Sequence, residues 1–335
     1  MDSPEESGTF YKLRYLDKPD IAWIDDIKAE VYLMEVDHVM DNFSLREPPV
    51  MMGIPMLRET DTTSDTTGGR LVLTSTLQNT SVIYGIDLQR NVRNATLFNM
   101  NMTPPQELFY LWPDATIQQF GAFAEATTSL DDRRRLVYGM RIDQVDPSAS
   151  LADASPNPAM YTANMAYMTY YGTKAEDQSE TNIGGLLRYE VDLDYGVTLF
   201  SGLSRTVRTA DATERYMNKW SPNPADRWVG NPAIEPEKHH QFDLGMLKQG
   251  GSHSLSATLF YDDVSDYILR DYAPDQAQIY RNVDAELYGL EIEGTWRLRP
   301  DLDLTAALAY VHATNTTDDR PIAQTPPLGG KVQLD

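Results

Sequence analysis

Apolar and polar side chains alternate along most of this chain, in segments of roughly ten residues. Clusters of glycine, proline, asparagine and aspartate separate the segments. In residues 288–299 the apolar side chains of Tyr288, Leu290 and Ile292 alternate with polar ones such as Glu291 and Glu293. Successive side chains of a strand point to opposite faces, so each segment predicts a strand with one apolar and one charged face.

The same pattern predicts strands near residues 8–17, 24–37, 69–78, 80–92, 116–129, 133–146, 160–173, 182–194, 196–208, 239–249, 253–262, 265–271, 277–298, 301–314 and 328–335. Short turns rich in Gly, Asp or Pro are expected at 131–132, 194–196, 250–252 and 299–301. Long polar connections are expected at 38–68, 93–115, 147–159, 209–238 and 315–327.

Short turns that alternate with long loops are typical of outer-membrane barrels, which carry the short turns in the periplasm and the long loops outside. We therefore predict an all-β fold, an antiparallel transmembrane β-barrel with lipid outside and water inside. Residues 1–335 form one barrel domain in this interpretation, and 38–68 and 209–238 are its long extracellular loops. Tyrosine outnumbers phenylalanine, 19 to 9, which suits a membrane interface.

Composition narrows the possible partners. The chain of 335 residues has 28 basic and 50 acidic residues and a net charge of −22, so nucleic acid is not an expected partner. It has no cysteine and therefore no disulfide or thiolate site. No apolar run approaches the ~18 residues of a spanning helix, but barrel strands place only alternate residues in lipid.

Both ends of the sequence suggest a fragment of a longer protein. Residues 1–6 are acidic and have no apolar core of the kind found in signal peptides, and residues 332–335 read as the beginning of a strand. We therefore expect an incomplete barrel.

Three segments resemble the barrel of TonB-dependent outer-membrane receptors. Residues 230–238 (GNPAIEPEK) are similar to a loop-to-strand signature of that family, and 259–268 (LFYDDVSDYI) to the strand that follows it. Residues 280–293 (YRNVDAELYGLEIE) resemble the next strand. The three occur in the family's order, within a resemblance that runs from about residue 116 onward.

Residues 32–46 (YLMEVDHVMDNFSLR) further resemble the TonB-dependent copper receptors. The family's copper site consists of a His-x-Met pair and a Cys-x-x-x-Met pair nearer the N-terminus. His38 and Met40 match the first pair, and the second is absent from this chain. The resemblance thus predicts half a copper site, with copper as the transported ion rather than a cofactor.

The resemblance also implies a plug domain and a segment that engages TonB, neither of which lies in these residues. It implies the outer membrane of a Gram-negative bacterium as the location, with the membrane lipids and the TonB complex as partners. About 22 strands close such a barrel. Fewer are predicted here, and an open sheet edge is not stable in lipid.

The chemistry of the pair agrees with this resemblance. Thioether sulfur is a soft ligand that suits Cu(I), and imidazole binds either oxidation state of copper. His38 and Met40 are two residues apart, so in an extended segment both side chains project to the same side. They can therefore contact one ion, completed by ligands from elsewhere.

Two other functions remain open. A receptor for a siderophore or another metal chelate would use aromatic and basic loop residues, which the 209–238 connection offers at Arg215, Tyr216, Trp220, Arg227 and Trp228. A passive porin would need neither plug nor TonB segment. We predict no catalytic residues and no enzyme, because no triad, GxSxG, phosphate-binding loop or HExxH motif is present.

Overall fold

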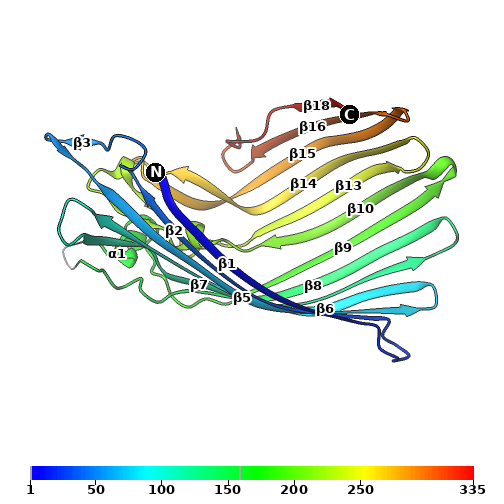
Figure 1. The fold of residues 1–335 in the computed structure, drawn as a ribbon, viewed down its shortest axis with the longest axis horizontal. Coiled ribbons are helices and arrows are strands. Elements are labelled where there is room, and N and C mark those ends of the chain that lie inside the picture. Colours follow the sequence, from blue (N-terminus) through cyan, green and yellow to red (C-terminus); the bar gives the residue numbers. More distant parts are fainter. Residues whose placement is uncertain (1, 158–159) are drawn as a thin grey trace.

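The computed structural model describes residues 2–157 and 160–335, most of which lie in one large antiparallel sheet (Figure 1). The long strands are β1 (Asp2–Asp17), β2 (Asp26–Asp41), β5 (Arg58–Leu77), β6 (Thr80–Asn99), β7 (Gln106–Ser129), β8 (Arg134–Ala149), β9 (Glu180–Leu193), β10 (Val197–Arg208), β13 (Glu237–Lys248), β14 (His253–Tyr272), β15 (Gln278–Arg299), β16 (Leu302–Asn315) and β18 (Gly329–Leu334).

The connections hold the smaller elements, which are β3 (Val50–Met51), β4 (Ile54–Pro55), α1 (Ala163–Tyr171), η1 (Asp194–Gly196), α2 (Ala212–Tyr216), β11 (Asn218–Lys219), η2 (Pro224–Asp226), β12 (Trp228–Val229) and β17 (Arg320–Pro321). Among the described residues, no helix is long and apolar enough to cross a membrane.

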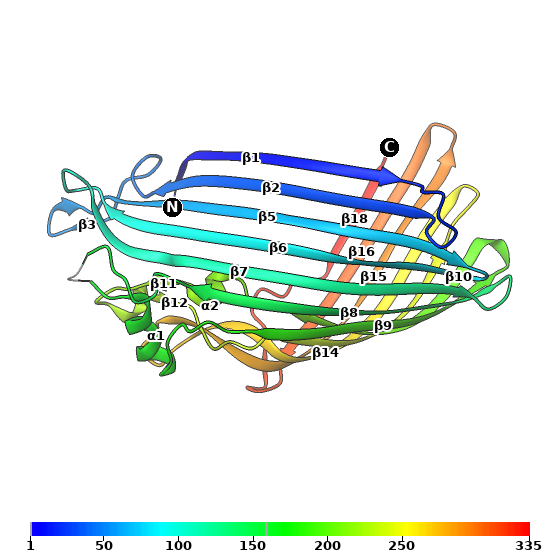
Figure 2. The same cartoon turned by 90° about the horizontal axis from the view of Figure 1, so that it is seen from below.

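The sheet curves into an open trough whose two edges are β1 and β18 (Figures 1 and 2). Each long strand pairs with its neighbour in the chain, and within the described residues β1 pairs only with β2 and β18 only with β16. The predicted all-β fold and the incomplete barrel are both confirmed. Helices α1 and α2 and strands β3, β11 and β12 lie at one end of the trough, and short turns join the strands at the other.

The two faces of the sheet differ in chemistry. One row of directly paired, exposed side chains crosses six strands: Tyr138, Leu187, Leu203, Phe242, Tyr261 and Tyr288. We call the face with this row the apolar face. The opposite, polar face carries Arg141, which donates to Asp87 at 2.8 Å and to Asp143 at 2.7 Å. This division is the one that strands between lipid and a water-filled lumen require.

Several predicted boundaries were wrong. Residues 93–115 are mostly strand rather than a connection, because β6 continues to Asn99 and β7 begins at Gln106. Residues 160–173 form no strand, because Thr162 caps the N-terminus of α1 and Gly172 ends the helix in the left-handed conformation. Residues 38–68 are only partly a connection, because β2 and β5 pair as far as Asp41 and Glu59. Residues 253–272 form one strand rather than two, with a register shift between Val264 and Tyr267. The placement of the 38–68 and 209–238 connections outside the cell stays a prediction.

Candidate metal centre at the end of β2

His38 and Met40 lie among the last residues of β2, at the end of the trough that carries the longer connections. This corrects the expectation that they lie in a loop. The polar sequence of β5 opposite this pair did not indicate a strand. His38 and Met40 pair there with Thr62 and Thr60, and threonine, although polar, is β-branched and therefore favours strands. Glu30 pairs directly with Arg70, which pairs directly with Asp87, so all three side chains lie on the polar face. In β2, His38 and Met40 lie an even number of positions after Glu30. Both side chains therefore project from the polar face.

The imidazole of His38 is half-buried and has one side-chain partner. Its Nε2 lies 2.6 Å from Ser3 Oγ of β1 in an exposed hydrogen bond. A hydrogen bond of this kind contributes about 0.5–1.5 kcal/mol. A metal ion that bound Nε2 would displace Ser3 at a small cost, so the ring is accessible as a ligand. The backbone carbonyl of His38 accepts from Thr62 Oγ1 at 2.8 Å, which holds the strand in place beneath the ring.

Met40 lies on the same face, next to residues that are buried from water. It is half-buried and pairs directly with Thr60, which is only 1% exposed and which pairs in turn with Leu97. Leu97 belongs to a buried cluster with Leu108 and Phe109. The hydroxyl of Thr60 has no hydrogen-bond partner among the described residues. The surroundings of Met40 thus favour a soft, weakly hydrated ion over a strongly hydrated one.

The connection that follows Met40, residues 42–57, is held by side chains of the strand ends. Asp41 accepts from the backbone N–H groups of Phe43 and Ser44 at 3.1 and 2.9 Å. The buried carboxylate of Asp2 accepts from the backbone of Leu45 at 3.0 Å and pairs with Arg46 at 2.6 Å. These contacts fix the direction in which the chain leaves the His38–Met40 pair.

A second group of contacts ties the same connection to that between β6 and β7. Asn101 accepts from Leu57 N at 2.9 Å and donates to the carbonyl of Pro55 at 2.7 Å. Asn42 donates to Met56 O at 2.9 Å and accepts from Arg58 N at 2.8 Å. Sequence spacing could not reveal Asp2, Ser3 or Asn101 as neighbours of the site, because strand pairing brings them there.

We expect Asp41→Ala to release residues 42–57 locally. The variant loses charge-assisted bonds to two backbone N–H groups, for a cost of about 1–3 kcal/mol. Hydrogen exchange of residues 42–57 should rise, whereas Asp41→Asn, which retains one acceptor, should have a smaller effect. Unchanged exchange in Asp41→Ala would mean that Asp2 and Asn101 suffice to hold the segment.

The pair offers two candidate ligands, an imidazole nitrogen and a thioether sulfur, and both suit copper. The described residues contain no group of three or more His, Cys, Asp or Glu side chains arranged to hold a metal.

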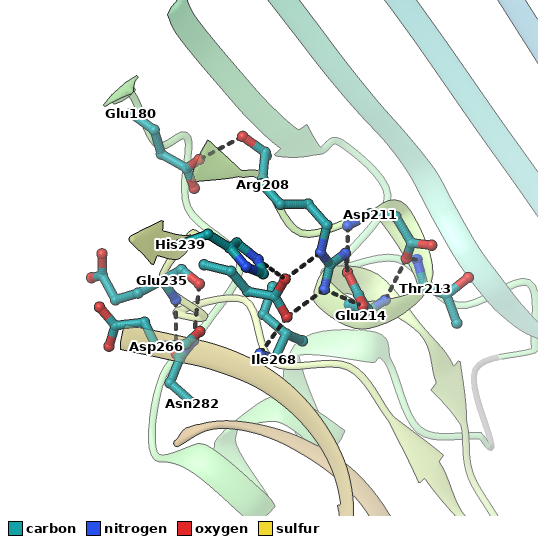
Figure 3. Close-up of polar contacts among 12 residues, drawn as sticks. Glu180, Arg208, Asp211, Thr213, Glu214, Glu235, His239, Asp266, Ile268 and Asn282 are labelled. Carbon is teal, nitrogen blue, oxygen red and sulfur yellow. Dashed lines mark hydrogen bonds and ion pairs between the residues drawn. The ribbon is translucent and has the colours of Figure 1, made fainter. Parts of the chain in front are cut away.

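The adjacent histidines His239 and His240 do not form a second site. They point to opposite faces of β13, as expected for neighbours in a strand. His239 Nδ1 lies 2.7 Å from Asp262. Its Nε2 lies 3.4 Å from Glu237, so this ring is part of an ion-pair network around that glutamate (Figure 3).

That network connects the three segments that carried the family resemblance. Arg208 binds Glu237 through two nitrogens, at 2.6 and 2.9 Å, and Glu214 through two more contacts, at 2.9 and 3.0 Å (Figure 3). Glu237, which is 3% exposed, also accepts from the backbone N–H of Ile268 at 2.7 Å. The glutamate of the first signature segment is therefore anchored to the second.

Asn282 of the third segment completes the connection. Its side chain donates to the carbonyls of Glu235 at 2.9 Å and Asp266 at 2.7 Å, and it accepts from Glu235 N at 2.9 Å (Figure 3). These signatures therefore have a structural role, because their side chains satisfy backbone groups where a loop returns to the sheet.

The basic and aromatic loop residues that could bind a large chelate are instead buried or in contact with other side chains of the protein. Arg215 and Tyr216 are fully buried. Trp220 stacks on Tyr161 with ring centroids 4.0 Å apart, and the guanidinium of Arg227 lies 3.8 Å from the centroid of Trp220. Trp228 donates to Tyr280 at 3.2 Å, and Arg270 covers its ring. Burial raises the pKa of the Tyr216 phenol, which keeps it neutral.

The fold and its two faces define a transmembrane barrel protein of the outer membrane. Residues 4–335 match the family model described as TonB dependent receptor-like, beta-barrel, and the chain belongs to this family of Gram-negative outer-membrane receptors. No curated protein matches the chain in a sequence comparison.

Several solved structures are similar to the chain. The copper transporter OprC is 28% identical with a TM-score of 0.81, over 99% of this chain and 50% of that one. The FrpB iron transporter from Neisseria meningitidis is 14% identical (TM-score 0.63; 98% and 48% covered), and the ferric yersiniabactin uptake receptor FyuA from Yersinia pestis is 14% identical (TM-score 0.61; 99% and 48% covered). The latter two show the fold alone. The chain spans about half the length of these relatives.

Proposed function

We propose that this chain is part of a TonB-dependent importer of copper ions, in which His38 and Met40 are two of the metal ligands. The observation that carries the proposal is the placement of an imidazole and a thioether on one polar face, two residues apart, at the loop end of β2. The likeness to a copper transporter along 99% of the chain supports it.

In this proposal the complete receptor captures copper at the cell surface. Energy from the inner membrane, relayed by TonB, moves a plug domain and releases the ion to the periplasm. His38 and Met40 bind and orient the ion at the entrance, and the polar face of the barrel forms the wall of the path. Uptake then needs no chemical reaction.

A receptor for a metal chelate is the alternative, since FyuA takes up a ferric chelate. Such a ligand needs exposed basic and aromatic side chains, and the residues of the 209–238 connection that could serve are buried or in contact with other side chains of the protein. The copper proposal is therefore favoured over the chelate alternative.

The test measures copper bound to the complete receptor by elemental analysis, with a His38→Ala/Met40→Leu variant. Leucine keeps the apolar volume of Met40 and removes its sulfur. We expect stoichiometric copper in the parent and a loss of most of it in the variant. The matched control is His253→Ala/Met140→Leu, which changes a histidine at the short-turn end and a 61% exposed methionine. If the folded parent binds no copper, the chelate alternative gains support.

A further inference from the structure

The apolar face carries a groove over β9, β10 and β13, strands that lie side by side in Figure 1. Its volume is about 370 Å³. Leu187, Leu203 and Phe242 line it, and all three are exposed, from 43% to 59%. Gly185 lies beside them without a side chain, which leaves room for a narrow apolar ligand.

One end of the groove is polar. Arg205 pairs directly with His240 across β10 and β13, and both belong to the apolar face. The guanidinium of Arg205 donates to the carbonyl of Ile183 and, among the described residues, forms no ion pair. The positive charge of Arg205 is therefore not neutralised by a carboxylate of the described residues and can interact with an anionic ligand.

The groove lies where apolar and polar rows meet. Leu187, Leu203 and Phe242 are part of the row that contains three tyrosines, and such aromatic rows mark the interface where the acyl chains end and the headgroups begin. Gly185, Arg205 and His240 form the next row toward the longer connections. The apolar walls are thus at acyl-chain depth, and the basic end is at headgroup depth.

We propose that this groove binds a phosphorylated, acylated lipid of the outer leaflet. An acyl chain lies along Leu187, Leu203 and Phe242, and the phosphate accepts hydrogen bonds from Arg205 and His240. Guanidinium groups bind phosphate oxygens through charge-assisted, often bidentate bonds. Asp263 and Glu286 continue the row beyond His240 and repel phosphate, so the headgroup lies on the β9 side, over Gly185.

The experiment uses the complete receptor in detergent and counts bound lipid by native mass spectrometry. The probes are lipid A with its phosphates and the same lipid after dephosphorylation. We expect the phosphorylated form to bind at least about tenfold more tightly. Equal binding of the two probes would overturn the proposal.

Substitutions of groove residues test where on the barrel the lipid phosphate binds. Arg205→Glu should abolish the preference for phosphate, Arg205→Gln should reduce it, and Arg205→Lys should retain most of it. The control Arg133→Glu makes the same charge change in the β7–β8 turn at the other end of the barrel and should leave binding unchanged. Leu203→Ala should weaken the binding of both lipid probes by the same factor. A preference for phosphate that persists in both Arg205→Glu and Arg205→Gln would show that the lipid binds elsewhere.

Discussion

Replacing Arg215 with alanine should loosen the connection between β10 and β13 by about 3–5 kcal/mol, the usual cost of breaking a buried ion pair. The Arg215 side chain is fully buried and pairs with Glu180 at the start of β9. It also donates to Gln178 at 2.7 Å and to the carbonyl of Pro232 at 3.1 Å. One side chain thus joins α2 to two other segments, and its removal leaves Glu180 buried without a cation.

Hydrogen exchange of residues 209–236 in the complete receptor measures this effect. A loss of 3 kcal/mol corresponds to roughly a hundredfold increase in local opening. Lys219→Ala, an exposed change in the same connection, is the matched control and should alter exchange little. A charge-free double variant, Arg215→Met/Glu180→Leu, should be less disturbed than Arg215→Ala. If Arg215→Ala behaves like Lys219→Ala, the ion pair does not hold this connection.

The strand pattern could be read from the sequence wherever one face meets lipid. In β13 and β15 the apolar side chains of Phe242, Leu244 and Tyr288 are exposed on one face, and polar side chains such as Asp243 alternate with them. The loop ends of β2 and β5 were missed because polar side chains occur on both faces there, so no regular alternation marks the strand. Backbone pairing, which the sequence does not display, extends these strands to Asp41 and Arg58.

Helix α1 was missed for a different reason. Its tyrosines and methionines resemble a strand in composition, and its buried side chains, including Ala163, Ala166 and Tyr167, pack with Ala152 and with Val229 of β12. The local signals were present, since the capping residue Thr162 and the helix-ending Gly172 enclose a helix of nine residues. Tertiary packing decided the outcome over the apolar pattern.

The sequence predicted the relative orientation of His38 and Met40 but not their neighbours in the structure. The spacing of His38 and Met40 gave their common side, because a strand repeats every two residues. It could not give Ser3 as the partner of His38 or Thr60 as the buried neighbour of Met40, since both depend on the register of β1 and β5 with β2. Register is set by the whole sheet rather than by the site.

The two proposed ligands, His38 and Met40, should differ in their effect on the two oxidation states of copper. Met40→Leu removes a soft sulfur, so the affinity for Cu(I) should fall by at least about tenfold, or about 1.4 kcal/mol, with a smaller change for Cu(II). His38→Ala removes an imidazole that binds both states, so both affinities should fall. Competition with chelators specific for Cu(I) and Cu(II), on the complete receptor, measures both affinities for each of the two variants.

This pattern separates a ligand from a packing residue. Met40 lies beside the buried Thr60 and could act on binding only through the shape of β2, in which case both copper states would lose affinity equally. Met40→Leu preserves that shape, so a loss confined to Cu(I) can arise only from the sulfur. A variant in which Ser3 is replaced by alanine should leave affinity equal or slightly higher, because Ser3 competes with the ion for Nε2 of His38. Lower affinity in Ser3→Ala would instead make the serine a positioning residue for the imidazole.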